Sequence, residues 1–239
     1  MTRPKFVTAA FRMTMGLGLA SALLATAACG HRTASMRLPK GLPTAAPTTL
    51  SAKVDPDVTH DPDNVLFLDL SNGGRVAIRL VPAWAPKHVE RIKTLVHEGF
   101  YNGIIFHRVV DGFMAQTGDP TGTGSGGSKL PDLKGEFNAM PHVRGSVSMA
   151  RTDDPNSANS QFFIVFYPHF SLDRHYTNFG RVISGMDMVD EITRGEPPQN
   201  PTKILQASLA SEHKPRPAPA APVAAPSITA SDLSKSVSH

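Results

Sequence analysis

The spacing of apolar residues between positions 65 and 80 predicts a β-hairpin. Two apolar segments, VLFLDL at 65–70 and RVAIRL at 75–80, flank the polar connection SNGG. A short connection that contains glycine is typical of a turn between antiparallel strands. Because strand side chains alternate between two faces, the second segment separates into two sets: Val76, Ile78 and Leu80 on one face, and Arg75, Ala77 and Arg79 on the other.

Two helices are predicted in the rest of the chain. Pro86 begins the stretch PKHVERIKTLVHEGF, in which apolar residues recur at helical spacing and Gly99 is a stop signal. The apolar positions are Val89, Ile92, Leu95 and Val96. A second, shorter helix is expected at 186–193, just before Gly195 and two prolines.

The remaining apolar segments have the length of β-strands. Clusters of Gly, Pro, Asp and Asn separate them, and they lie at 106–109, 113–117, 146–150, 161–166, 179–182 and 203–209. Many short strands with only two helices do not alternate as the elements of a parallel α/β sheet do. We therefore expect a mainly β protein with an antiparallel sheet that is closed or nearly closed.

Composition divides the chain into four parts. Residues 31–62 and 211–239 are rich in Pro, Ala, Ser and Thr, so neither segment can offset the entropy of ordering by burying apolar surface. The length of 239 residues allows one domain with a substantial core. We expect the following division: a signal peptide at 1–28, a flexible linker at 29–62, one folded domain at 63–210 and a disordered Pro/Ala-rich tail at 211–239.

The amino terminus has the pattern of an export signal. Arg3, Lys5 and Arg12 precede the apolar stretch MTMGLGLASALLATAA, which is too short and too diluted by Gly and Thr for a transmembrane span. The motif TAACG places the only cysteine, Cys29, after small residues. This resembles a bacterial lipobox, although Thr26 stands where Leu is usual.

We expect a lipid anchor on Cys29, which would place the protein in the periplasm or cell envelope. The membrane would then be contacted only through that lipid. Ordinary signal-peptidase cleavage after ATA or TAA is the alternative. A single cysteine cannot form an internal disulfide, even in an oxidising compartment.

Charge and motif searches exclude several function classes. The net charge of +4 falls by three to +1 once Arg3, Lys5 and Arg12 are removed with the signal, so no binding of nucleic acid is expected. Paired cysteines, HExxH and histidines at ligand spacing are absent from the sequence, so no metal is expected.

A glycine-rich stretch matches the motif of a dinucleotide-binding site but lacks the helix that such a site needs. GTGSGG matches G-x-G-x-x-G at Gly122, Gly124 and Gly127, but that motif needs a helix after it. Pro131 and the polar run SKLPDLKGE follow instead. A flexible surface loop is the better interpretation, and we expect no cofactor.

The stretch FHRVVDGFMAQ combines a cation with apolar residues and an amide. By chemistry alone, Phe113 and Met114 are typical of a core, and Arg108 is typical of a solvated strand end. Alternation from Phe113 puts it on the opposite face from Met114 and Gln116. His107 is expected to be a hydrogen-bonded core histidine.

Three motifs carry a family resemblance. FHRVVDGFMAQTGDPTGTGSGG, GSVSMAR and PNSANSQFFIV, in this order, resemble the cyclophilin family of peptidyl-prolyl cis-trans isomerases over about residues 65–209. The resemblance implies a closed eight-stranded antiparallel β-barrel capped by two α-helices. It also implies proline-containing polypeptides as partners and no cofactor, and we expect a monomer that accelerates the folding of envelope proteins.

The resemblance also implies a set of site residues. The catalytic residues would be Arg108, Phe113 and Gln116, and the substrate-binding residues would be Met114, Ala150, Arg151, Gln161, Phe163, Leu172 and Tyr176. Three positions depart from the family's usual residues: Tyr176 replaces His, Ser171 replaces Trp and Arg151 replaces Asn. Gln161 could instead be a buried structural amide, and Tyr176 could support the barrel rather than line the groove.

These residue types suit rotation about an X-Pro bond. The barrier is about 18–20 kcal/mol, and the uncatalysed rotation takes roughly tens to hundreds of seconds. A gain of about four decades in rate needs roughly 5–6 kcal/mol of differential stabilisation. Arg108 would donate to the pyramidal nitrogen of the twisted bond, an apolar pocket would hold the proline, and Gln116 would bind peptide backbone and orient Arg108.

Two other functions fit the same sequence. The groove could grip proline peptides without useful turnover, as a binding module or holdase chaperone. Alternatively, the Pro/Ala tail could be a docking arm for which the folded domain is only a carrier.

Overall fold

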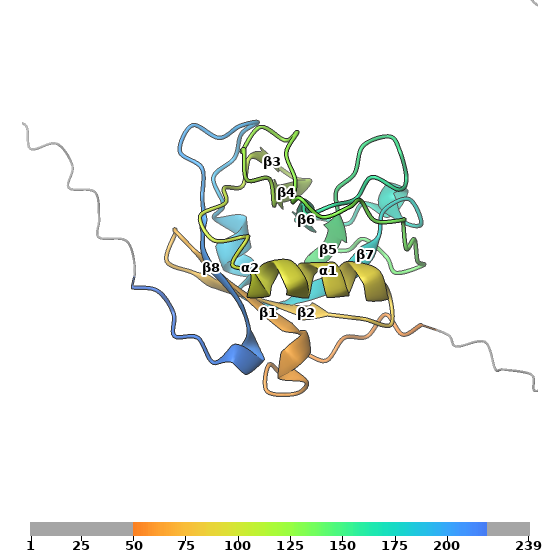
Figure 1. Ribbon diagram of the computed structural model, residues 1–239, viewed down its shortest axis with the longest axis horizontal. Helices are drawn as coiled ribbons and strands as arrows, with labels where there is room; N and C mark the ends of the chain where they lie inside the picture. Colours follow the sequence, from red (N-terminus) through yellow and green to blue (C-terminus); the bar gives the residue numbers. More distant parts are fainter. Residues whose placement is uncertain (1–49, 219–239) are drawn as a thin grey trace, which may run out of the picture. The chain divides into compact units, whose positions relative to one another are not determined.

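Eight strands form one antiparallel sheet in the part of the protein that the structure describes. The structure is a computed structural model, and it describes residues 50–218 (Figure 1). The strands are β1 (Val65–Leu70), β2 (Arg75–Leu80), β3 (Arg108–Val110), β4 (Met114–Thr117), β5 (Ser146–Met149), β6 (Phe162–Val165), β7 (Asn178–Ser184) and β8 (Ile204–Leu209). The helices are α1 (Pro86–His97) and α2 (Met186–Asp190). The predicted hairpin and first helix are confirmed, and α2 ends three residues earlier than predicted.

The sheet is open, so the expected closed barrel is wrong. Its strand order is β3-β4-β6-β5-β7-β2-β1-β8, and the two edge strands β3 and β8 do not pair with each other. An isolated bridge between Ile105 and Lys203, and three backbone hydrogen bonds around it, join the segment before β3 to the start of β8. The reason lies at β3, because its free edge is occupied by Gly195, which exchanges two backbone hydrogen bonds with Val109. The result is a curled half-barrel.

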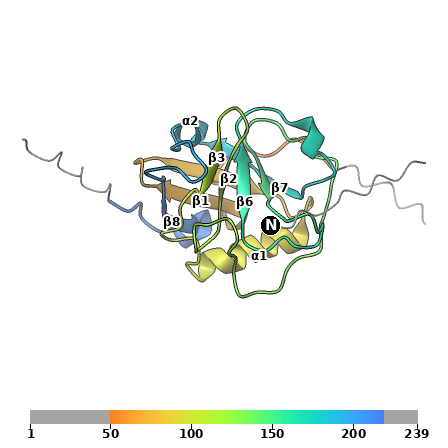
Figure 2. The ribbon, with the colours of Figure 1, turned by 90° about the horizontal axis from the view of Figure 1, so that it is seen from above.

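The two helices lie on different sides of the strands, as Figure 2 shows. Helix α1 packs against β7 and β8 and buries Val89, Ile92, Leu95 and Val96, which are the four positions that the sequence pattern predicted. Helix α2 lies next to β2 and buries Val189. The main core therefore fills the space between the curled sheet and α1.

Both faces of β2 are covered, although alternation predicted two distinct faces. Val76, Ile78 and Leu80 are at most 1% exposed, but Arg79 is only 5% exposed. Its guanidinium donates to four main-chain carbonyl oxygens, which belong to Asp55, Asp57, His60 and Asp61. The carbonyl groups therefore solvate the buried charge in place of water.

The segment before β1 is held against the domain at further points. The indole Nε1 of Trp84 donates to the carbonyl of Ser51 at 3.0 Å, and Arg181 donates to the carbonyl of Ala52 at 3.5 Å. Residues 51–61 thus contact the sheet, although they precede the domain boundary expected at residue 63.

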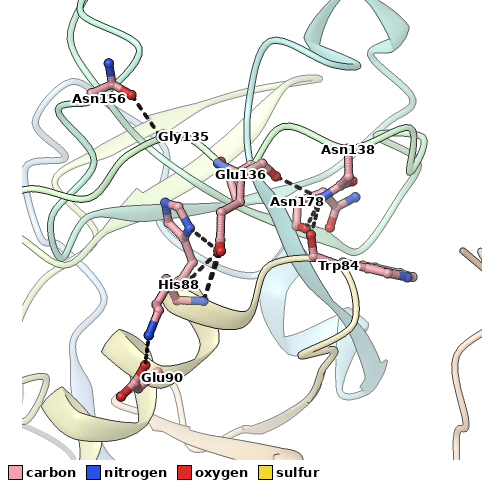
Figure 3. A network of polar contacts seen from close by, with 10 residues as sticks. Trp84, His88, Glu90, Gly135, Glu136, Asn138, Asn156 and Asn178 are labelled. Atoms are coloured by element: carbon pink, nitrogen blue, oxygen red, sulfur yellow. Dashed lines mark hydrogen bonds and ion pairs between the residues drawn. The ribbon is translucent and has the colours of Figure 1, made fainter.

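A long connection without strands runs from β4 to β5, and a carboxylate ties it to α1 (Figure 3). Ala85 precedes α1 and has no capping side chain. Instead, the Glu136 carboxylate accepts the backbone N–H groups of Lys87 and His88 at 3.0 and 3.1 Å, and the Nδ1 of His88 at 2.7 Å. A carboxylate at a helix N-terminus satisfies unpaired N–H groups and opposes the positive end of the helix dipole.

The predicted signal peptide and the predicted lipid anchor at Cys29 lie outside the described residues. Within residues 50–218, no helix has the length and apolar character needed to cross a bilayer.

Candidate active site

A cavity of about 270 Å³ lies over strands β3, β4 and β6. Nine side chains line it: Arg108, Phe113, Met114, Gln116, Ala150, Arg151, Phe163, Leu172 and Tyr176. We call this cavity the groove. Every predicted site residue except Gln161 lines it, and Gln161 lines a second cavity next to it.

The apolar part of the groove is a cluster separate from the main core. Met114, Phe163 and Val165 are at most 4% exposed, and Phe113 and Leu172 pack against them. Phe113 shares this cluster with Met114 despite the opposite faces predicted from alternation. The reason is local, because Phe113 precedes β4 in a turn in which its N–H donates to the carbonyl of Val110.

Neighbouring rings hold the aromatic walls in position. The rings of Phe113 and His169 meet edge to face at 4.6 Å, and those of Phe163 and Tyr176 do so at 5.6 Å. Tyr176 therefore lines the groove and supports its wall at the same time. The ring of His142 stacks on Phe163, with the ring centroids 6.4 Å apart.

A buried histidine links the groove wall to the turn that carries Leu172. The Nδ1 of His142 lies 2.8 Å from Oδ1 of Asp173, and its Nε2 lies 2.8 Å from the Ser148 hydroxyl. Burial lowers the pKa of His142, and the hydrogen bond to Asp173 opposes that change. Asp173 follows Leu172 directly, so this contact helps to set the position of Leu172.

Arg108 is held by a residue that the sequence did not single out. Its Nε lies 2.8 Å from Oε2 of Glu196, and no other side-chain hydrogen bond of Arg108 occurs within residues 50–218. The expectation that Gln116 orients Arg108 is therefore wrong. The two residues are cross-strand partners, but the amide of Gln116 donates to Oε1 of Gln161 at 2.8 Å instead.

Gln161 connects the groove to the glycine-rich loop. Its Nε2 donates to the carbonyls of Gly124 and Gly126 at 2.9 and 2.7 Å. These bonds fit the alternative that the sequence left open, in which Gln161 is a structural amide.

The second cavity, of about 490 Å³, is lined mainly by polar residues and glycines and shares lining residues with the groove; we call it the polar cavity. Its walls include the loop 124–128, Asp132 and Asn159, and it shares Gln116 and Arg151 with the groove. The guanidinium of Arg151 lies 4.7 Å from the ring centroid of Tyr176 and donates to the carbonyl of His175. Arg151 therefore forms a wall between the two cavities.

His107 is buried but not hydrogen-bonded, which corrects part of the prediction. It is 5% exposed, and neither ring nitrogen has a hydrogen-bond partner within the described part of the chain. Burial lowers the pKa of His107, although the nearby Asp119 carboxylate opposes this. The lowered pKa favours the neutral form of the ring. Among residues 50–218, no group of three His, Cys, Asp or Glu side chains could hold a metal ion.

Comparison with known proteins identifies the family. A family model described as "Cyclophilin type peptidyl-prolyl cis-trans isomerase/CLD" matches residues 67–209, which is more than half of the chain. The chain belongs to the cyclophilin family. It is a cyclophilin-type peptidyl-prolyl cis-trans isomerase, and the matched range includes every residue of the groove.

Named relatives of this cyclophilin include a bacterial and a fungal protein. It is 49% identical over 170 residues to a protein of Brucella suis called "Probable peptidyl-prolyl cis-trans isomerase", covering 64% of this chain and 86% of the relative. It is 42% identical over 148 residues to "Peptidyl-prolyl cis-trans isomerase-like 1" of Aspergillus niger, covering 58% and 91%.

Solved cyclophilin structures share the fold. A cyclophilin from Hirschia baltica matches with a TM-score of 0.60 and 33% identity, covering 65% of this chain and 77% of that one. A cyclophilin of Cryptosporidium parvum, solved in the presence of the dipeptide Ala-Pro, matches with a TM-score of 0.57 and 28% identity, covering 61% and 98%.

Proposed function

We propose that this cyclophilin accelerates rotation about X-Pro bonds in polypeptides that fold in the cell envelope, with Arg108 as the catalytic donor. The observation that carries the proposal is the common cavity of Arg108, Phe113 and Phe163. A cation at the edge of an apolar slot can distinguish a twisted imide from a planar one. The planar form delocalises its nitrogen lone pair into the carbonyl, whereas the twisted form has a localised lone pair that accepts a hydrogen bond.

The substrate proline sits in the apolar cluster. Phe113, Met114, Phe163 and Leu172 form a pocket for a ring of this size, and they exclude water from it. The carbonyl before the proline is then free to rotate while the ring stays in place. Gln116 and Ala150 lie at the edge of the same cavity and contact the peptide backbone.

Arg108 contributes only part of the rate gain. A charge-assisted hydrogen bond contributes about 1.5–3 kcal/mol, whereas four decades of acceleration need roughly 5–6 kcal/mol. The remainder comes from the apolar walls, which hold the substrate in the reactive geometry and strengthen the hydrogen bond by excluding water.

The test is the variant Arg108→Ala in an isomerisation assay with a proline-containing peptide. Loss of one guanidinium donor lowers kcat/KM by about 10- to 150-fold, from the same 1.5–3 kcal/mol. Circular dichroism and thermal unfolding should match the original protein, because Arg108 is 42% exposed. Unchanged turnover would refute the role of Arg108. Tight peptide binding without turnover in the original protein would favour the holdase interpretation.

We further propose export and lipid attachment at Cys29. The support is the basic residues before a short apolar stretch, followed by TAACG. Mass spectrometry of the mature protein from a membrane fraction is expected to detect an amino-terminal Cys29 that carries diacylglycerol, and Cys29→Ser should release the protein from that fraction. An unmodified amino terminus after ATA or TAA would refute lipidation.

A further inference from the structure

Glu196 stands beside Arg108 because the backbone places it there. Val109 and Gly195 form an antiparallel bridge, with Val109 N–H donating to Gly195 at 2.8 Å and Gly195 N–H donating back at 3.0 Å. In an antiparallel pairing of this register, the residue after Gly195 lies opposite the residue before Val109. Glu196 is therefore the cross-strand neighbour of Arg108, and its carboxylate reaches Nε at 2.8 Å.

The segment that carries Glu196 is anchored on its other side as well. The Nε of Arg194 lies 3.1 Å from Oδ1 of Asp111, in the turn after β3. The guanidinium of Arg194 also donates to the carbonyls of Asp190 and Ile192 and lies 4.3 Å from the ring centroid of Phe166. Residues 194–196 thus run along β3 and the turn after it, and each of the three contacts a residue there.

Gly195 is the residue that permits this close path. Its φ is +140°, and a Cβ atom at this position would lie 2.6 Å from the Cα of Pro198. Any other residue would collide with the Pro197–Pro198 stretch that follows, so the backbone could not take this path at Gly195. The position of Glu196 is therefore set by the fold and not by a chance meeting of two long side chains.

The contact selects which donors of Arg108 remain for substrate. Guanidinium has five N–H donors in a planar fork, and Glu196 uses the one on Nε. The two terminal nitrogens, Nη1 and Nη2, have no hydrogen-bond partner within residues 50–218, and Arg108 lines the groove together with Phe113. An arginine on an edge strand without this partner would sample several rotamers, and only some would direct the terminal nitrogens into the groove.

We propose that Glu196 is a positioning residue for isomerisation: it binds Nε of Arg108 and holds the terminal nitrogens toward the imide nitrogen. This inference rests on the proposed catalytic role of Arg108. An exposed ion pair of this kind adds little to folding stability, since the two side chains are 42% and 52% exposed. Its effect should therefore be visible in turnover and not in unfolding.

The experiment measures kcat and KM of peptide isomerisation for Glu196→Ala and Glu196→Gln. Glu196→Ala is expected to lower kcat about 3- to 10-fold and to change KM less than about twofold, because ground-state binding uses the apolar pocket. Glu196→Gln retains an oxygen acceptor for Nε and should keep more than about half of the original kcat. Glu90→Ala is the matched control, since it removes an exposed ion pair with Lys87 on α1 and should leave kcat unchanged.

A double variant separates positioning from a structural effect. In the Arg108→Ala background, Glu196→Ala is expected to cause no further loss, because the side chain it orients is gone. The inference is overturned if Glu196→Ala keeps full kcat, if Glu196→Gln falls as far as Glu196→Ala, or if the loss persists without Arg108. Full activity of Arg108→Ala alone would overturn the catalytic role of Arg108 and this inference together. Loss of activity in Arg108→Ala with an unaffected Glu196→Ala would overturn only the latter.

Discussion

The groove and the polar cavity next to it share a wall but are built in different ways. The groove is lined by side chains from three adjacent strands and by rings that pack on each other. The polar cavity is lined by the loop 124–128 and by residues such as Asp132 and Asn159, and hydrogen bonds set the path of that loop. The packed side chains of the groove resist a change in its volume. The conformation of the loop depends instead on the few groups that accept its backbone hydrogen bonds.

Asp119 is the main acceptor behind the polar cavity. Its carboxylate receives the backbone N–H groups of Thr121, Thr123, Gly124 and Gly126. Burial alone would raise the pKa of Asp119, but the hydrogen bonds from the Thr121 hydroxyl and from backbone N–H groups outweigh it and lower the pKa to about 2. One buried carboxylate therefore holds four backbone N–H groups of residues 121–126 in the glycine-rich loop.

The largest effect is expected from emptying the groove. Phe163→Ala removes a ring that is 4% exposed and packs against Tyr176 and His142, so it should cost about 3–5 kcal/mol of unfolding free energy. It should also raise KM more than about tenfold, because the proline loses a wall of its pocket. Urea unfolding and peptide kinetics measure the two effects.

The control for that variant is Phe170→Ala. Phe170 is 63% exposed, so its loss should change the unfolding free energy by less than about 0.5 kcal/mol. Equal costs for the two variants would contradict the view that packing holds the groove.

An intermediate effect is expected from removing the acceptor of the polar cavity. Asp119→Ala leaves four backbone N–H groups without their partner and should cost about 2–3 kcal/mol of unfolding free energy. The kcat of a short peptide should fall less than about threefold, since the apolar groove is untouched. Urea unfolding and the isomerisation assay measure both. The control is Asp153→Ala, which removes an exposed acid. A fall in kcat of more than about threefold in Asp119→Ala would show that the groove depends on the polar cavity.

The smallest effect is a decrease in the unfolding free energy of the domain as the pH falls. Burial lowers the pKa of His88, His107 and His142 from its ordinary value of 6.5. Below that pH the unfolded chain binds protons that the folded protein binds less readily, so stability decreases with falling pH. We expect a loss of about 1–2 kcal/mol between pH 7 and pH 5, measured by urea unfolding at both values.

A single substitution sharpens the pH prediction. His107→Gln removes one of the three titrating groups, so the loss between pH 7 and pH 5 should become smaller in this variant. Stability that stays constant or rises over this range would show that the buried histidines do not control it. The Asp119 carboxylate contributes at lower pH only, because its stabilisation is present above its ordinary pKa of 3.8 and is lost as the pH approaches 2.

Local patterns predicted the elements of this protein well. Alternation and turn residues located β1 and β2 at their observed bounds, and helical spacing located α1 and the four side chains it buries. The motifs that resemble cyclophilins identified the residues that meet in the groove. These features could be predicted because each depends on residues a few positions apart, or on a family pattern written directly in the chain.

Contacts between distant segments depended on the tertiary structure. The burial of Arg79 needs carbonyl groups from residues 55–61, the helix cap of α1 needs Glu136, and the partner of Arg108 lies 88 positions away at Glu196. The same bridge at Gly195 that brings Glu196 to the groove also leaves the sheet open. The sequence by itself determined which segments are strands and helices and which side chains are apolar. Only the folded chain decided which polar group meets which, because a hydrogen bond or ion pair between distant segments leaves no periodic signal in the sequence.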